Sequence, residues 1–172
     1  MDKIEFMAMR RAIKDGNIEE VKKLFYDNPS LINEVTPFGT WLQMAAAQGN
    51  VIMTGFMIEC GIDINKCGGA SDGGPINSAA ANGHLDVVKL LIEKGAVLDT
   101  STAAKNPVIA AIYDGHYDVV KYLVEKGIDI TATYEIGSIK HCDACEYARQ
   151  YGRTEIYNYL KKVLNEKIDK LV

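Results

Sequence analysis

The feature that most constrains this chain is an internal repeat. Three segments align without a gap: "AAAQGNVIMTGFMIECGIDIN" from Ala45, "AAANGHLDVVKLLIEKGAVLD" from Ala79, and "AIYDGHYDVVKYLVEKGIDIT" from Ala111. A fixed period of 20 to 50 residues is typical of repeat arrays, in which one structural unit is stacked on copies of itself. The repeat therefore takes precedence over any single motif in predicting the fold.

A glycine marks the middle of each unit. Gly49, Gly83 and Gly115 lie 34 and 32 positions apart, Gly16 lies 33 positions earlier than Gly49, and Gly152 lies 37 positions after Gly115. These marker glycines predict five units, the outer two degenerate, in one domain that spans residues 1–172. The approximate units are 1–33, 34–65, 66–99, 100–131 and 132–172.

Each unit is expected to form two short helices. In the third unit Leu85, Val88, Leu91 and Ile92 recur at helical spacing, which predicts one buried face. Gly95 then follows the last apolar residue, where a glycine can take the left-handed conformation that ends a helix. Gly61 and Gly127 stand at the equivalent positions of the neighbouring units. The predicted fold class is an all-α solenoid of about five helix-turn-helix units.

The run "GHLDVVKLLIEKGAVLD" from Gly83 and its counterpart "GHYDVVKYLVEKGIDI" from Gly115 resemble the ankyrin repeat, and the resemblance covers nearly the whole chain. The Thr-Pro-Leu-His segment of that family is poorly kept. Gln43 and Asn77 could imitate the hydrogen bonding of its histidine, but Ile109 cannot. The fourth turn is therefore expected to be held less rigidly than the second and third.

Composition excludes several classes of function. The chain has 19 basic and 23 acidic side chains, a net charge of −4, which disfavours nucleic-acid binding because such binding needs a basic surface. No stretch approaches the roughly 18 apolar residues that cross a bilayer. The start of the chain lacks the uninterrupted apolar segment of a secretory signal. We expect a cytoplasmic protein with reduced cysteines, no membrane partner, and a monomeric free state.

The segment "HCDAC", residues 141–145, has the outline of half a zinc site or of a thiol-disulfide motif. Repeat register argues against both, because Cys145 aligns with Leu42, Ile76 and Val108 and is expected to be a buried small apolar residue. Cys60 and Cys67 lie about three repeats away, too far to complete a four-ligand set. The remaining alternative is an exposed, oxidisable Cys142.

No other segment predicts catalysis. His84 and His116 each precede an aspartate by two positions, but they recur in register as turn residues of the repeat rather than as an acid-base pair. The loop "KCGGASDGGP" from Lys66 lacks the ending and the preceding strand of a phosphate-binding loop. We therefore expect no enzyme activity, no cofactor and no metal.

The candidate binding residues come from the loops and from the two positions before each marker glycine, which are expected to project from one concave face. Tyr113 and Tyr134 are the expected anchors, since aromatic side chains often carry interface energy. Phe38 and Trp41 are equally compatible with filling the gap beside the degenerate first repeat. The full predicted set is Phe38, Trp41, Gln48, Asp72, Asn82, Lys105, Tyr113, Asp114, Tyr134, His141 and Gln150.

Solenoids offer extended surfaces, so the sequence predicts a protein that binds a partner protein. The segments "GTWLQMAAAQGN" and "IECGIDIN" resemble small stand-alone bacterial ankyrin-repeat proteins, several of which act as immunity proteins against toxins. That resemblance implies an inhibitor of a toxin domain, and the acidic net charge suits a basic one. A general scaffold or adaptor and an oligomerising protein are the alternatives, with an enzyme more distant.

Overall fold

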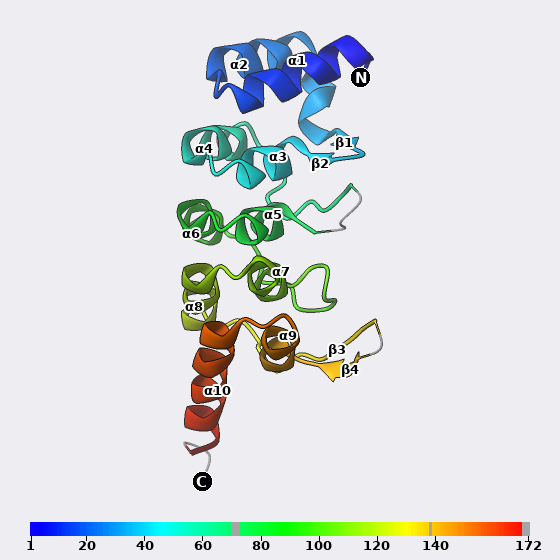
Figure 1. Ribbon diagram of the computed structural model, residues 1–172. Coiled ribbons are helices and arrows are strands. Elements are labelled where there is room, and N and C mark those ends of the chain that lie inside the picture. The colour runs from blue at the N-terminus through cyan, green and yellow to red at the C-terminus, as the bar shows by residue number, and fades with distance from the viewer. Residues whose placement is uncertain (70–72, 138, 170–172) are drawn as a thin grey trace.

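The computed structural model describes residues 1–69, 73–137 and 139–169. Ten α-helices are assigned in this part of the chain, and they stack as five pairs in one elongated array (Figure 1). The first helices of the pairs form an inner layer: α1 (Lys3–Lys14), α3 (Trp41–Ala47), α5 (Pro75–Ala81), α7 (Pro107–Asp114) and α9 (Ala144–Gln150). The second helices form an outer layer: α2 (Ile18–Asp27), α4 (Val51–Glu59), α6 (Leu85–Glu93), α8 (Tyr117–Glu125) and α10 (Thr154–Asp169).

Short β-hairpins extend from the side of the stack that lies opposite the outer helices (Figure 1). One joins β1 (Val35–Thr36) to β2 (Gly39–Thr40), after a 3-10 helix, η1 (Pro29–Asn33), and the other joins β3 (Tyr134–Ile136) to β4 (Ile139–Cys142). The prediction of an all-α chain is therefore correct for the solenoid layers but missed these two antiparallel pairs. In the β3–β4 hairpin, half-buried Ile136 and Ile139 pack against the core.

Local sequence explains where the inner helices begin. Thr40 and Gln43 form a capping box at the start of α3, and the side chains of Asn106 and Asp143 accept hydrogen bonds from the first turns of α7 and α9. Pro75 and Pro107 occupy the first helical position, where a missing backbone N–H costs nothing. Gly61, Gly95 and Gly127 follow the outer helices with φ of 86°, 95° and 84°, which confirms the predicted left-handed stops.

The residue after each marker glycine joins neighbouring repeats. His84 Nε2 donates a hydrogen bond to the Ala47 carbonyl at 3.0 Å, and His116 Nε2 makes the same bond with the Ala81 carbonyl at 3.0 Å. Arg153 takes over this place in the last repeat and donates to the Tyr113 carbonyl. The two histidines are thus structural turn residues, as their register predicts.

Space explains why a glycine precedes these side chains. A Cβ at Gly83 would lie 2.5 Å from His116 Nδ1, and the backbone there has a φ of 72° that other residues rarely adopt. The imidazole of the following repeat consequently packs directly on the glycine backbone. The same close approach recurs one repeat earlier, where His84 lies under Gly49.

The core follows the stack from end to end. Buried side chains from the inner and outer helices form two clusters, one around Trp41 and Met57 in the first two repeats and one around Leu91, Ile112 and Leu123 in the later repeats. Each repeat contacts chiefly its neighbours, as expected for a solenoid. This arrangement leaves one side of the inner helices available along the length of the array.

Candidate functional site

The inner helices expose a row of side chains just before the marker glycines. Gln48, Asn82, Asp114 and Gln150 are all exposed, and Tyr113 has half of its surface, 51%, open to solvent. Each of these residues holds one of the two places that precede a marker glycine, so together they line one continuous face. The structure therefore brings together five of the predicted residues on what is referred to below as the concave face.

A shallow hollow of about 250 Å³ lies at the centre of this face. Its lining consists of small or short polar side chains from the second, third and fourth repeats: Ala47, Gly73, Asn77, Ser78, Ala81, Asn82, Ala104 and Ala110. Alanine and serine at these places leave room above α3, α5 and α7 where larger residues would fill it. A protruding side chain of a partner could enter this space without displacing any part of the scaffold.

A cluster of three tyrosines follows the hollow toward the C-terminal repeat. Tyr113 lies one turn beyond Ala110 on α7, and its ring centroid is 5.1 Å from that of Tyr151. Tyr151 in turn lies 4.4 Å from Tyr147, which is buried, and burial raises the pKa of Tyr147. The exposed ring of Tyr151 therefore packs between the exposed Tyr113 and the buried Tyr147.

Sequence reasoning did not find Tyr151, which is 40% exposed. A signal was present, because Tyr151 immediately precedes Gly152 and so aligns with Gln48, Asn82 and Asp114. The longer spacing before Gly152 concealed that register. With Tyr113, this residue gives the concave face its only pair of exposed aromatic rings in contact among the described residues.

Phe38 stands at the turn of the β1–β2 hairpin and is 63% exposed, consistent with a surface role. Its ring stacks on Phe6 with centroids 6.0 Å apart, and the Arg10 guanidinium carbon lies 5.3 Å from the ring centroid. The hairpin thereby holds the ring beside α1. Of the two alternatives for this residue, packing against the first repeat and exposure to a partner, the structure shows features of both.

Trp41 is a correction. The indole is fully buried, packs 5.8 Å from the Phe6 ring, and donates from Nε1 to the Leu31 carbonyl at 2.9 Å. It fills the space between the first and second repeats, so a partner cannot reach it. The inclusion of Trp41 in the binding surface is therefore wrong, and its gap-filling alternative is correct.

Tyr134 is a second correction. Its side chain is half-buried, and its hydroxyl donates to the Thr100 carbonyl at 2.7 Å and accepts from Asn106 Nδ2 at 2.9 Å. Burial raises the pKa of this hydroxyl. Tyr134 is thus an internal tie between the β3–β4 hairpin and the preceding loop rather than a free anchor.

The hydrogen bonds of Tyr134 also explain how the fourth turn is held. Gln43 Nε2 donates to the Gly68 carbonyl at 3.1 Å, and Asn77 Nδ2 donates to the Ala104 carbonyl at 3.1 Å, so both imitate the missing histidine as predicted. Ile109 is buried and makes no such bond, also as predicted. The fourth turn is nevertheless held, because Tyr134 reaches back from the next repeat.

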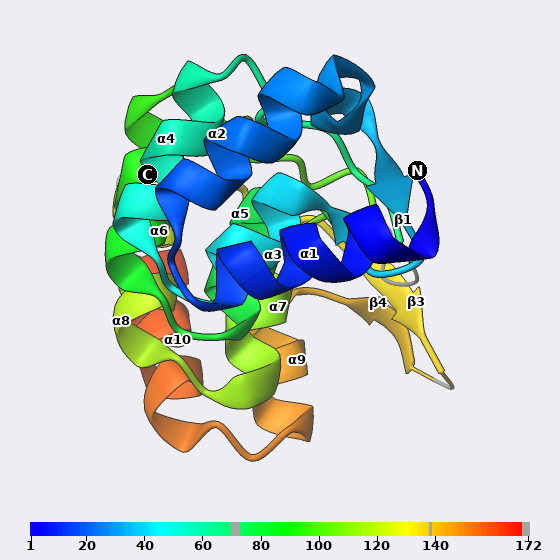
Figure 2. The same ribbon diagram turned by 90° about the horizontal axis from the view of Figure 1, so that it is seen from above.

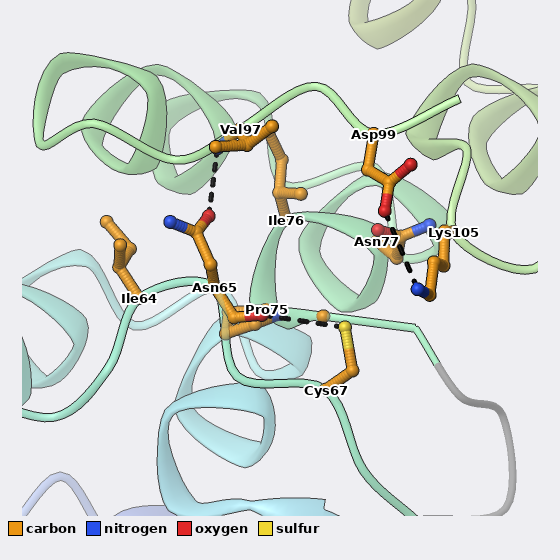
Figure 3. A pocket seen from close by; sticks show the side chains of 10 residues that line it. Ile64, Asn65, Cys67, Pro75, Ile76, Asn77, Val97, Asp99 and Lys105 are labelled. Carbon is orange, nitrogen blue, oxygen red and sulfur yellow. Dashed lines mark hydrogen bonds and ion pairs between the residues drawn. The ribbon is translucent and has the colours of Figure 1, made fainter. Parts of the chain in front are cut away.

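Lys105 lies in a pocket of about 260 Å³ between two inter-repeat loops, where its ammonium is 3.7 Å from the Asp99 carboxylate (Figure 3). Ile64, Pro75, Ile76 and Val97 supply the apolar part of the wall. Lys105 is therefore half-buried and already paired.

Two predicted binding residues remain. His141 is exposed on β4 with a φ of 53°, whereas Asp72 lies outside the described residues.

The structure differs from the expectation of a buried Cys145 and from the alternative of an exposed Cys142 in "HCDAC". Cys142 is fully buried at the end of β4, and Cys145 is only half-buried on the first turn of α9. Cys142 ends β4 and points into the core, while Cys145 lies on the first turn of α9 and packs against the edge of the core. Burial raises the pKa of both thiols.

Among the residues described, no three histidine, cysteine, aspartate or glutamate side chains lie together as a metal site would require. Within the same residues, no helix has both the length and the apolar character needed to cross a membrane.

A family model for ankyrin repeats, in three copies, matches residues 8–102 and 71–134. The chain belongs to the ankyrin-repeat family. Ankyrin repeats generally serve as non-enzymatic modules for protein-protein interaction. The predicted resemblance to the ankyrin repeat is confirmed by this match.

The chain is similar to parts of several curated relatives. The chain is 30% identical over 95 residues to a putative ankyrin repeat protein of Rickettsia felis, which covers 55% of this chain and 37% of that protein. It is 46% identical over 63 residues to cortactin-binding protein 2 of Rattus norvegicus, covering 36% and 4%. A third relative, ankyrin repeat and SAM domain-containing protein 6 of Rattus norvegicus, is 31% identical over 96 residues, covering 55% and 11%. The chain thus spans well under half the length of these relatives.

Proposed function

We propose that this ankyrin-repeat chain binds a partner protein in the central hollow of its concave face, with Tyr113 and Tyr151 as the principal anchors. The observation that carries the proposal is the juxtaposition of a hollow lined by small side chains with two exposed, mutually packed aromatic rings. Rigid aromatic side chains provide large contact area at low entropic cost, which is why they dominate many interfaces.

The more specific form of the proposal is an immunity protein that neutralises a toxin domain. The net charge of −4 supports attraction of a basic toxin over long distances. The names of the relatives concern ankyrin repeats, a SAM domain and cortactin binding, so support for this form comes from the chain alone. A toxin encoded by the adjacent gene, whose growth defect is relieved by co-expression of this chain, is the expected result; a metabolic partner there would contradict it.

The anchors are tested once a partner has been isolated from the native cell. Replacing Tyr113 and Tyr151 together by alanine should weaken binding by more than about 2 kcal/mol, measured by isothermal titration calorimetry. The matched control replaces Asp86 and Lys89, an exposed ion pair on the outer helix α6, by alanine. That control should bind as the wild type does. Loss of binding in the control with retention in the tyrosine variant would place the partner on the outer helices.

A scaffold role remains the alternative to inhibition, and oligomerisation is the other. We propose that the free chain is a monomer, because each repeat packs chiefly on its neighbours and α10 packs against α9 and α8. Light scattering after size-exclusion chromatography should give the mass of one chain, 18.9 kDa. A concentration-independent dimer would favour the oligomerising alternative.

A further inference from the structure

Helix α1 carries three basic side chains and one methionine in a row on one exposed face. Lys3, Met7, Arg10 and Lys14 follow one another at spacings of four, three and four residues, so they share one side of the helix. All four side chains are exposed. These four residues are called the basic stripe below.

The charge of the basic stripe is not neutralised within the described chain. No carboxylate there pairs with Lys3, Arg10 or Lys14, because the acidic residues around α1 are engaged elsewhere. Asp2 caps the helix by accepting from the Glu5 N–H, and Asp15 lies 3.5 Å from Arg11.

Glu5 is engaged twice. It accepts from Asn28 Nδ2 at 3.0 Å and from the Asp2 N–H at 2.9 Å, and these bonds lower the pKa of its carboxyl. A chain whose net charge is −4 therefore presents a locally positive strip at its first repeat.

Apolar surface adjoins this charge. Phe38 is 63% exposed with Arg10 over its ring, and Met7 is 52% exposed within the stripe itself. Figure 2 shows β1 near the N-terminal end of α1, and the stacking of Phe38 on Phe6 of α1 holds the ring against the helix. Exposed aromatic and basic side chains at one place can accommodate an apolar side chain and a carboxylate at the same time.

The basic stripe is continuous with the concave face. Lys14 lies two positions before Gly16, the place that Ala47, Ala81 and Tyr113 hold in later repeats. The row that lines the hollow therefore ends in positive charge at the first repeat. In the fourth repeat the same row carries the exposed carboxylate of Asp114 next to Tyr113, so the sign of the exposed charge differs between these two places on the face.

We propose that the basic stripe and Phe38 bind an acidic segment of the partner that also carries a large apolar side chain. This inference rests on the proposed function, since it extends the same concave face, and it fixes how the partner lies: its acidic segment over α1 and its remaining contacts toward Tyr113. The net negative charge governs long-range attraction, whereas the segment in contact with α1 is selected by the local positive charge.

The experiment uses a random peptide library displayed on phage and selected against the immobilised full chain. Enriched peptides should be rich in aspartate and glutamate with at least one aromatic or large aliphatic residue. Their affinities are then measured by fluorescence anisotropy for variants of the chain. Replacing Arg10 and Lys14 by glutamine should weaken binding at least about tenfold and reduce its dependence on salt.

The matched control replaces Lys23 and Lys121, exposed lysines of the outer helices α2 and α8, by glutamine, which removes the same charge. It should change affinity by less than about twofold. Equal weakening in the two variants would overturn the proposal, and so would tighter binding of a single-stranded oligonucleotide than of the acidic peptides.

The outcomes also separate this inference from the proposed function. Selected peptides that are neutral or basic, but lose affinity when Tyr113 and Tyr151 are replaced, would overturn the acidic segment and leave the groove intact. Acidic peptides that depend on Arg10 and Lys14 but not on the tyrosines would support the stripe and count against the hollow. Thermal melting of each variant shows whether the fold is retained.

Discussion

Replacement of Tyr134 by phenylalanine should destabilise the chain, because it removes a hydroxyl that links two repeats. That hydroxyl donates to the Thr100 carbonyl and accepts from Asn106 Nδ2, and both groups would lose a partner at a half-buried place. Each hydrogen bond of this kind contributes about 1 kcal/mol, and partial access of water offsets some of the loss. We expect the free energy of unfolding to fall by about 1 to 2 kcal/mol.

Urea unfolding followed by circular dichroism measures this change, and the melting temperature should fall by about 2 to 8 °C for a chain of this size. The matched control is Tyr113→Phe, because Tyr113 is half-exposed and its hydroxyl makes no hydrogen bond among the described residues. The control should lie within about 0.5 kcal/mol of the wild type.

Equal stability of Tyr134→Phe and the wild type would refute the reasoning. It would mean that the hairpin hydroxyl exchanges its partners for water at no cost, and that the fourth turn is as loosely held as Ile109 alone implies. A loss well above about 3 kcal/mol would also contradict it, since two neutral hydrogen bonds cannot account for such a change. Partner affinity should remain unchanged in this variant, in contrast to the replacement of Tyr113 and Tyr151.

Three further measurements test the scaffold. Gly55→Ala should raise stability in urea by up to about 1 kcal/mol, because the site is helical and a new Cβ would meet only a Leu90 methyl at 3.8 Å; a loss would show that the close approach matters. Gly83→Ala should lower the free energy of unfolding more than Gly95→Ala does. Both glycines have positive φ, but only at Gly83 would a Cβ also lie 2.5 Å from an imidazole. Equal losses would assign the effect to backbone strain alone. Cys142 should react with a maleimide only after unfolding, because it is fully buried and its thiol pKa is raised; rapid labelling in the native protein, located by peptide mass spectrometry, would contradict that placement.

The layers of the fold were predictable because they follow from periodic local signals. Apolar spacing around Leu85 and Leu91 predicted the outer helix of the third repeat, and Gly95 predicted its end. The replacement of a histidine by Gln43 and Asn77 was also readable, since an amide can donate to the carbonyls that face it. Each of these signals depends on residues close in sequence or on one repeated register.

The errors fall where a side chain from one repeat meets another at a place that the repeat pattern does not specify. Tyr134 looked exposed because the partners of its hydroxyl, Thr100 and Asn106, lie about one repeat earlier in the chain. Trp41 was ambiguous for the same reason, since the Leu31 carbonyl that it contacts comes from the irregular first repeat. The burial of Cys142 required knowledge of the hairpin, and a pairing of strands that short leaves almost no pattern in sequence.

The bonds that His84 and His116 make to main-chain carbonyls have a consequence for how such an array can change its length. Each histidine donates to a backbone carbonyl, a group that every residue possesses. The hydrogen bond between repeats therefore does not require a particular amino acid at the position of the carbonyl. A duplicated or deleted unit would present the same carbonyl and the same glycine to its new neighbour. Arg153 shows that even the donor can be exchanged. Gene segments that encode single units can therefore be added or lost while the hydrogen-bonded contact between units keeps its geometry.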